Sequence, residues 1–397
     1  MYDIVIIGAG ASGLLCASNI IKNNSSLKVC LLEKNDKIGK KVLITGNGRC
    51  NLGNANVLLN NYSSNSSLKR FEKELISSSY LDFFKEIGLI TKHIGDKLYP
   101  YSMQASTVVE VLEKSVKANV EIINNFIVKR IIKKDDIFII NNEIKAKKII
   151  VATGGKSYPK TGSTGDGYNL LKSFGHKITC LYPSLVALKT NNRNLAFVSG
   201  VRFDGNVSLI INDNVIKAET GQIQFNKDNI SGICVFNISR DVKKYLNDGK
   251  MVFINIDIMP EYDASSLKKY LKKFPEETVY NFLTGIINNK LAKLITKENN
   301  LSQIIIKQLD EEKTNSLINK VHGLKFQIID TLNFDSAQVT SGGVCIDEFT
   351  DNLESKIVDN LFVIGELLDV DGACGGYNLN FAFTTAMIVS KYVSKEF

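Results

Sequence analysis

The chain has 397 residues, of which 44% are hydrophobic, and its 49 Lys and Arg against 41 Asp and Glu give a net charge of +8. This length predicts more than one domain, and the apolar content predicts sizeable cores, which excludes a wholly disordered chain. The positive charge is compatible with RNA, phosphate or an anionic membrane surface, but it selects none of them.

The cysteines and histidines argue against disulfides and against a metal site. There are seven cysteines, an odd number, and no two have C-x-x-C spacing; the three histidines are also far apart. A disulfide framework needs paired cysteines, and a zinc site needs closely spaced ligands. We therefore expect a reducing, cytoplasmic location and no bound metal.

Residues 2–34, YDIVIIGAGASGLLCASNIIKNNSSLKVCLLEK, predict a strand, a glycine turn, a helix and a second strand. Tyr2–Ile7 is a continuous apolar run typical of a buried parallel strand, the helix ends near Asn23, and the second strand covers Lys28–Leu32. The turn fits G-x-G-x-x-G. Glu33 follows its last glycine by about 20 residues, where an acidic side chain accepts hydrogen bonds from a ribose. Together these features predict a dinucleotide-binding site.

Each position of this fingerprint has a physical role. Gly8 permits the tight turn, Gly10 lets the backbone approach a pyrophosphate, and Gly13 lets the helix pack on the strand. The first helical residues, Ala11 and Ser12, direct their N–H groups at the phosphates. The uncharged stretch 4–21 therefore belongs to a folded domain. It lacks the basic flank of a signal peptide, and no later stretch is long and apolar enough to span a bilayer.

Three further segments are rich in glycine. Residues 39–54 read GKKVLITGNGRCNLGN. A strand at Ile149–Ala152 precedes the second segment, ATGGKSYPKTGSTGDGY, which leads into a helix. The third, GELLDVDGACGGYNLNFAF, follows another strand, and we expect the final helix to begin near Asn378.

The middle of the chain has a different pattern. Short alternating segments fill 188–257, with a hairpin around Asn212-Asp213-Asn214, and helical patterns fill 264–320. We therefore expect an insert at 189–335, β-rich over 189–258 and helical over 259–335, between a first part at 1–188 and a second part at 336–397.

The motifs together resemble the BaiN/RdsA family of bacterial FAD proteins, also known as HI0933-like or aminoacetone-oxidase-like flavoproteins. Besides the segments above, LYPYSMQAS, GQIQFNKDNISGICVFNISR and AQVTSGGV match the family in order, so the resemblance spans nearly the whole chain. It implies an α/β fold: a two-part Rossmann-like FAD-binding domain with an inserted β-barrel-like and helical region.

The resemblance also implies the cofactor. Only one dinucleotide fingerprint is present, and the family binds FAD there, so NADH or NADPH would act as a transient electron donor. The loop holding Gly46 and Gly48 would run along the flavin, with Arg49 as a cation beside the pyrophosphate or the reduced ring. The cofactor-binding residues we expect are Gly8, Gly10, Ala11, Ser12, Gly13, Glu33, Lys34, Lys41, Asn47, Gly48, Arg49, Asn51, Ala152, Thr153, Gly154, Gly155, Gly365, Glu366, Asp369, Gly375, Gly376, Asn378 and Leu379.

Members of the family differ in substrate. One branch resembles ribosomal RNA dihydrouridine synthases, a second acts in bile-acid dehydroxylation, and a third is described as aminoacetone oxidase. We favour the first, in which reduced flavin passes hydride to C6 of uracil and an acid protonates C5; the basic charge agrees with an RNA substrate. Candidate acids are Cys50, Tyr101 and Tyr377, although packing alone also explains Cys50 and Tyr377.

Two alternatives stay open, namely a small-molecule oxidase or reductase and an RNA- or protein-binding module with structural FAD. The sequence also departs from the family pattern F-T-H-x-G-x-S-G-P, because Asn226 and Lys227 replace Thr and His, Asn229 replaces Gly, and Ile233 replaces Pro. A substrate role for that His cannot be carried over to this chain.

Overall fold

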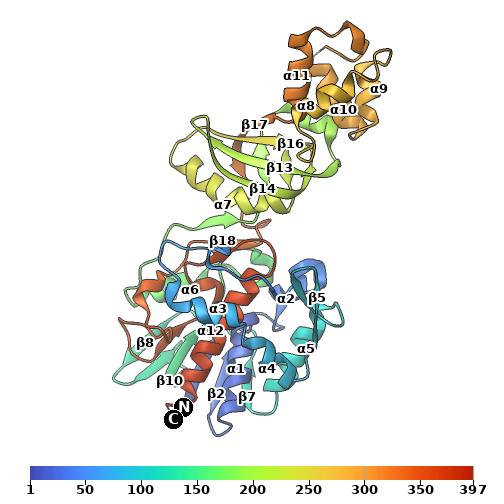
Figure 1. Cartoon of the computed structure of the whole chain (residues 1–397). Helices are drawn as coiled ribbons and strands as arrows, with labels where there is room; N and C mark the ends of the chain where they lie inside the picture. The colour runs from blue at the N-terminus through green and yellow to red at the C-terminus, as the bar shows by residue number, and fades with distance from the viewer. Residues whose placement is uncertain (299, 397) are drawn as a thin grey trace. The chain divides into compact units, whose positions relative to one another are not determined.

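The computed structural model describes residues 1–298 and 300–396, which form two compact units (Figure 1). Unit 1 combines Met1–Tyr182 with Ala337–Phe397, and unit 2 is the intervening Pro183–Ser336. The sequence analysis divides the chain into domains after residues 188 and 335. These domain boundaries stay a prediction.

The centre of unit 1 is a seven-stranded sheet. Its parallel strands are, in spatial order, β7 (Val120–Ile123), β2 (Val29–Leu32), β1 (Tyr2–Ile7), β10 (Ile144–Val151) and β19 (Leu361–Val363). The antiparallel hairpin β8 (Ile131–Lys134) and β9 (Ile137–Ile140) extends the first half of β10. Because β1, β2 and β10 run in parallel, the loops after them meet at one edge of the sheet, where such folds bind ligands.

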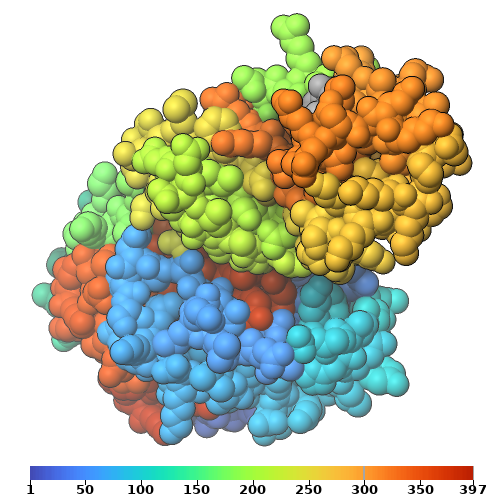
Figure 2. Space-filling view, turned by 45° about the horizontal axis from the view of Figure 1, so that its top comes forward, coloured from blue at the N-terminus to red at the C-terminus, as the bar shows by residue number. Residues whose placement is uncertain are grey.

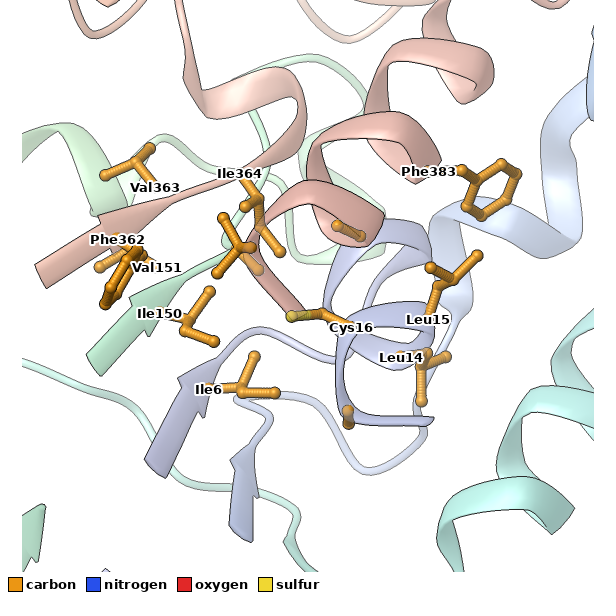
Figure 3. Packing of buried hydrophobic residues seen from close by; sticks show 14 of the residues in the cluster. Ile6, Leu14, Leu15, Cys16, Ile150, Val151, Phe362, Val363, Ile364 and Phe383 are labelled. Atoms are coloured by element: carbon orange, nitrogen blue, oxygen red, sulfur yellow. The ribbon is translucent and has the colours of Figure 1, made fainter. Parts of the chain in front are cut away.

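Helices α1 (Ala11–Asn23) and α12 (Tyr377–Val393) pack against each other beside this sheet. Figure 3 shows Ile6, Ile150 and Ile364 next to Cys16 of α1, with Phe383 of α12 beyond Leu15. All six side chains are fully buried. The uncharged stretch 4–21 is thus the buried strand and helix of a globular core. Among the described residues, no helix combines the length and hydropathy required to cross a bilayer.

Smaller elements surround this core. The remaining helices of unit 1 are α2 (Lys40–Ile44), α3 (Glu72–Ser77), α4 (Tyr80–Glu86), α5 (Ala105–Val116) and α6 (Asp166–Ser173). Two small antiparallel sheets join β3 (Gly53–Asn54), β6 (Lys97–Pro100) and β5 (Thr91–Ile94), and β4 (Tyr62–Ser63) with β20 (Asp371–Gly372).

Unit 2 is a closed six-stranded barrel with helices. The strands are, in order around the barrel, β12 (Leu188–Thr190), β15 (Asn229–Ser231), β14 (Asn214–Phe225), β13 (Arg202–Ile211), β16 (Val252–Asp257) and β17 (Leu324–Thr331). The helices are α7 (Ile233–Asn247), α8 (Ala264–Leu271), α9 (Val279–Thr284), α10 (Asn289–Glu298) and α11 (Glu311–Val321). The β13–β14 hairpin turns at Asn212 and Asp213, both with positive φ, as a two-residue type I′ turn requires.

The expected fold class, a Rossmann-like α/β domain with an inserted barrel and helices, is confirmed. The positions of two elements differ from the sequence pattern. Helix α7 lies within the segment expected to be β-rich, and strand β17 lies within the segment expected to be helical. β17 completes the barrel by pairing with both β12 and β16.

Candidate active site

A cavity opens at the edge of the unit 1 sheet where β1, β2 and β10 end. Its empty volume is about 1230 Å³ including the open mouth. The expected cofactor-binding residues that line it are Gly8, Gly10, Ala11, Ser12, Glu33, Lys34, Lys41, Ala152, Thr153, Gly154, Glu366, Asn378 and Leu379. Residues distant in the sequence therefore meet in one place, as a dinucleotide site at a sheet edge requires.

The glycines of the fingerprint have the geometry that their roles demand. Gly8 has a φ of +108°, and a Cβ there would lie 2.5 Å from the Ala152 carbonyl oxygen. A Cβ on Gly13 would lie 1.9 Å from the Gly8 oxygen, so helix α1 and the turn touch directly. A Cβ on Gly10, by contrast, would meet no atom within 4 Å. The backbone at Gly10 thus faces open space on the cavity wall.

The N-terminus of α1 is available to an anion. No side chain caps it, and its first turn holds no acidic residue. The first N–H groups of a helix have no partner within the helix and carry a partial positive charge. An uncapped helix start on the wall of this cavity fits the pyrophosphate of a dinucleotide.

Glu33 is buried at the end of β2 and organises the adjoining loop. Its carboxylate accepts hydrogen bonds from the backbone nitrogens of Ala9, at 2.9 Å, and Asn35, at 2.8 Å. The side-chain amide of Asn35 donates to the same carboxylate at 2.7 Å. Glu33 therefore fixes the loop after β2 against the fingerprint turn while it lines the cavity.

An ion pair between Lys41 and Glu366 joins the N-terminal and C-terminal parts of unit 1. Lys41 of α2 contacts Glu366, with 2.7 Å between Nζ and Oε2. The other carboxylate oxygen of Glu366 accepts from the Thr340 backbone nitrogen at 2.9 Å. Lys34 likewise pairs with Asp166 at the start of α6. Each lysine charge at the cavity wall is thus held by a carboxylate.

The loop Gly46–Gly48 does not line the cavity, although the preceding Thr45 does. Gly46, Asn47, Gly48 and Cys50 all have positive φ, which only a tightly turned loop produces. Arg49 is exposed, and its guanidinium lies 5.6 Å from the centre of the Tyr99 ring.

The three candidate proton donors have very different surroundings, and none lines the cavity. Cys50 is fully buried, and desolvation raises the pKa of its thiol to about 11. Tyr377 is nearly buried and donates from its hydroxyl to the Asn56 carbonyl at 3.2 Å. Tyr101 is 66% exposed, with Lys92 Nζ 4.9 Å from the centre of its ring.

Several of the remaining expected residues contact other parts of unit 1 instead of the cavity. A Cβ on Gly376 would lie 2.4 Å from the Gly53 oxygen, so the start of α12 touches β3 directly. The Asn51 side chain accepts from the Leu98 backbone nitrogen at 3.2 Å. Asp369 is fully buried and accepts from the Asn65 amide at 2.8 Å. Gly13, Asn47, Gly48, Arg49, Asn51, Gly155, Gly365, Asp369, Gly375 and Gly376 do not line the cavity among the described residues.

Several lining residues were not expected. They include Lys40, Thr45, Asp166, Gln338 and Val339. The last two belong to AQVTSGGV, so the family motif already marked that segment, although the sequence assigned it no role. The sequence predicted helix α6 as well, but it did not predict that Asp166, the first residue of this helix, lines the cavity.

The four departures from the family pattern cluster in unit 2, at the end of β14 and the start of α7. The Asn226 amide donates to Asn229 Oδ1 at 2.8 Å and to the Ser231 hydroxyl at 3.1 Å. Ile233, the first residue of α7, is 43% exposed. Asn226 and Asn229 thus hold the loop between β14 and β15, and nothing in the structure explains Lys227.

Comparisons with known proteins agree with this arrangement. The model of the HI0933-like protein Rossmann domain matches residues 2–392. A 3-dehydro-bile acid Δ(4,6)-reductase from Clostridium scindens is 37% identical, with all of both chains covered. A ribosomal RNA dihydrouridine synthase from Haemophilus influenzae is 27% identical over 99% of this chain and 98% of its own.

The solved structure of 3-ketosteroid Δ1-dehydrogenase from Sterolibacterium denitrificans covers both chains fully, with a TM-score of 0.51 at 9% identity. At this identity the likeness concerns the fold alone.

Proposed function

Because the chain belongs to the HI0933-like family of FAD-dependent oxidoreductases, we propose that it reduces a carbon–carbon double bond conjugated to a carbonyl group, in a uridine of large-subunit ribosomal RNA. FAD bound in the unit 1 cavity would supply the hydride, with NADH or NADPH as the electron source. The uncapped α1 N-terminus, the open wall at Gly10 and Glu33 are the features of the chain that fit this cofactor.

The reaction class is supported by what two full-length relatives have in common. One is named for reducing the 4 and 6 double bonds of a 3-oxo steroid acid, and the other for producing dihydrouridine. In both substrates the double bond is conjugated to a carbonyl group, so a hydride can add to the far carbon while a proton adds beside the carbonyl. One type of site can therefore serve either substrate.

The choice of RNA follows the full-length relative that is named for producing dihydrouridine in ribosomal RNA. The net charge of +8 is compatible with a polyanionic substrate, because phosphate contacts by Lys and Arg provide most of the affinity for nucleic acids. The competing candidate is a small enone, which the 37% identity with the bile acid reductase favours.

Of the three candidate acids, Tyr101 is the proton donor we propose. Its exposed hydroxyl can reach a large substrate, whereas Cys50 is enclosed and Tyr377 already donates to the Asn56 carbonyl. Tyr101→Phe should slow dihydrouridine formation while leaving the bleaching of the flavin by NADH unchanged. Equal turnover of this variant and the wild type would remove Tyr101 from the mechanism.

The deciding experiment compares electron acceptors. The holoenzyme is reduced anaerobically with NADH or NADPH and then mixed with unmodified large-subunit rRNA, a 3-oxo-4,6-diene steroid, or oxygen. The proposal expects reoxidation to be fastest with the rRNA, together with dihydrouridine in the digested product. Fastest reoxidation by the steroid would favour the enone reductase, and fastest reoxidation by oxygen, with peroxide release, would favour an oxidase.

A further inference from the structure

A basic surface with one exposed aromatic ring lies on unit 2. None of the residues that form it has been assigned a function above. It is formed by helix α10 and by the short 3-10 helix η5 (Arg193–Val198), which pack against each other. In Figure 2 the green surface around η5 adjoins the orange surface of this helical region near the top of the view. We name it the η5–α10 surface and define it by Arg193, Phe197, Lys290, Lys293 and Lys297.

The lysines occupy one face of α10. Lys290, Lys293 and Lys297 are exposed, while the opposite face of the helix is buried. Positions spaced by three and four residues lie above one another, so the three charges form a row about 10 Å long. Of the ten residues of α10, only the last, Glu298, is acidic. The row therefore presents a concentrated positive charge.

The structure holds Phe197 out from the protein. Its side chain is 63% exposed, whereas its neighbours Leu195 and Val198 are buried and anchor η5. The Lys297 Nζ lies 5.0 Å from the centre of the Phe197 ring. The Lys290 Nζ donates to the Ser199 carbonyl at 2.8 Å and so links the two helices. The ring and the row of charges thus form one continuous surface.

We propose that the η5–α10 surface binds single-stranded RNA, with Arg193, Lys293 and Lys297 at the phosphates and Phe197 stacked on an unpaired base. Single-stranded nucleic acids are bound by this combination of a positive track and an exposed aromatic ring. One lone ring gives little apolar area for membrane insertion, whereas it suffices to stack one base. The identification of that RNA as ribosomal rests on the function proposed above.

The test uses the full-length holoenzyme with two charge-reversal pairs. Lys293→Glu with Lys297→Glu removes the row, and Lys244→Glu with Lys250→Glu is a control of equal charge change at exposed positions elsewhere in unit 2. The first pair should weaken binding to a large-subunit rRNA fragment by at least about 10-fold and reduce the salt dependence, whereas the control pair should do neither. Phe197→Ala should weaken binding by about 10-fold with the salt dependence unchanged.

Several readouts separate the possible failures. Flavin bleaching by NADH and the melting temperature should stay at wild-type values in every variant. If both pairs weaken binding equally, or if the wild type binds vesicles of anionic lipid but no RNA, the η5–α10 surface is not an RNA site. If the wild type binds RNA through this surface but forms no dihydrouridine, RNA binding by the η5–α10 surface is supported and the proposed reaction is contradicted. If the wild type and the Lys293/Lys297 variant form dihydrouridine equally at limiting RNA, the proposed reaction is supported and the η5–α10 surface is not the RNA site.

Discussion

Gly10 and Gly13 belong to one fingerprint but have opposite surroundings. Gly13→Ala would place a Cβ 1.9 Å from the Gly8 oxygen, so the variant should lose more than about 3 kcal/mol of stability even without cofactor. Gly10→Ala adds a Cβ in open space, with a φ of −85° that alanine accepts. This second variant should fold normally and fail to retain FAD. Melting curves of the apoproteins and the flavin content after purification distinguish these outcomes; an unstable Gly10→Ala apoprotein would contradict the assignment of the cavity.

We expect Cys50 to be a packing residue, although it lies in a conspicuous motif. Its thiol is fully buried, so Cys50→Ala should cost about 1 kcal/mol at pH 7 and leave turnover intact. Burial raises the pKa of this thiol from 9.0 to about 11. The stability contributed by the neutral thiol is therefore complete below pH 9 and is lost as the pH rises towards 11, by up to about 3 kcal/mol.

The stability advantage of the wild type over Cys50→Ala should consequently fall from about 1 kcal/mol at pH 8, vanish at about pH 9.7 and reverse by about pH 10.5. Chemical denaturation at several pH values measures it, and the common titrations of other groups cancel in the comparison. Cys180→Ala, at an exposed thiol, serves as the control with no such trend. Retained FAD with lost turnover in Cys50→Ala would restore the proton-donor role.

The limits of sequence reasoning are clearest for side-chain direction. The motifs identified Lys41 and Glu366, and both line the cavity although they lie at opposite ends of the chain. The same reasoning named Cys50 and Tyr377 as candidate acids because they lie within the glycine-rich motifs. Proximity in the sequence does not determine whether a side chain faces the cavity or the core, and both of these side chains are buried.

At the scale of elements, a buried polar network fixes α12 to the small elements around it. Asn380 is fully buried; its Oδ1 accepts from the Tyr62 hydroxyl at 2.6 Å, and its amide donates to the Ser78 hydroxyl at 2.8 Å. Asn380→Ala removes the acceptor of the buried Tyr62 hydroxyl and a donor to the Ser78 hydroxyl, and it should cost about 3 kcal/mol. Asn247→Ala, at the exposed end of α7, should change the unfolding free energy little. Equal melting temperatures of the two variants would show that the network contributes nothing.

The elements that the sequence predicted well are those with local signals. The first strand, its glycine turn and α1 were predicted because their periodicity and turn residues are contiguous. Helix α7 and strand β17 were not predicted, although the buried positions of α7 follow a helical period and those of β17 alternate. The sequence prediction followed the overall composition of each segment and missed these short patterns. The pairing of β17 with β12 also joins residues more than a hundred positions apart, which a local pattern does not reveal.

At the scale of the whole molecule, the insertion of one continuous segment into a two-part unit has a consequence for folding. Residues 183–336 contain their own buried cluster, built around the barrel strands and the helices α7 to α11. A segment with its own core can fold alone when few of its contacts involve the rest of the chain. We therefore expect the isolated fragment 183–336 to unfold cooperatively and to bind no FAD.

Circular dichroism with thermal melting tests this expectation. Ile254, fully buried in β16, provides the control, because Ile254→Asp places a charge inside the barrel and should abolish the transition. A broad, non-cooperative melt of the parent fragment would show that unit 2 needs unit 1 to fold. In that case the domain boundaries expected after residues 188 and 335 would describe only how contacts are grouped.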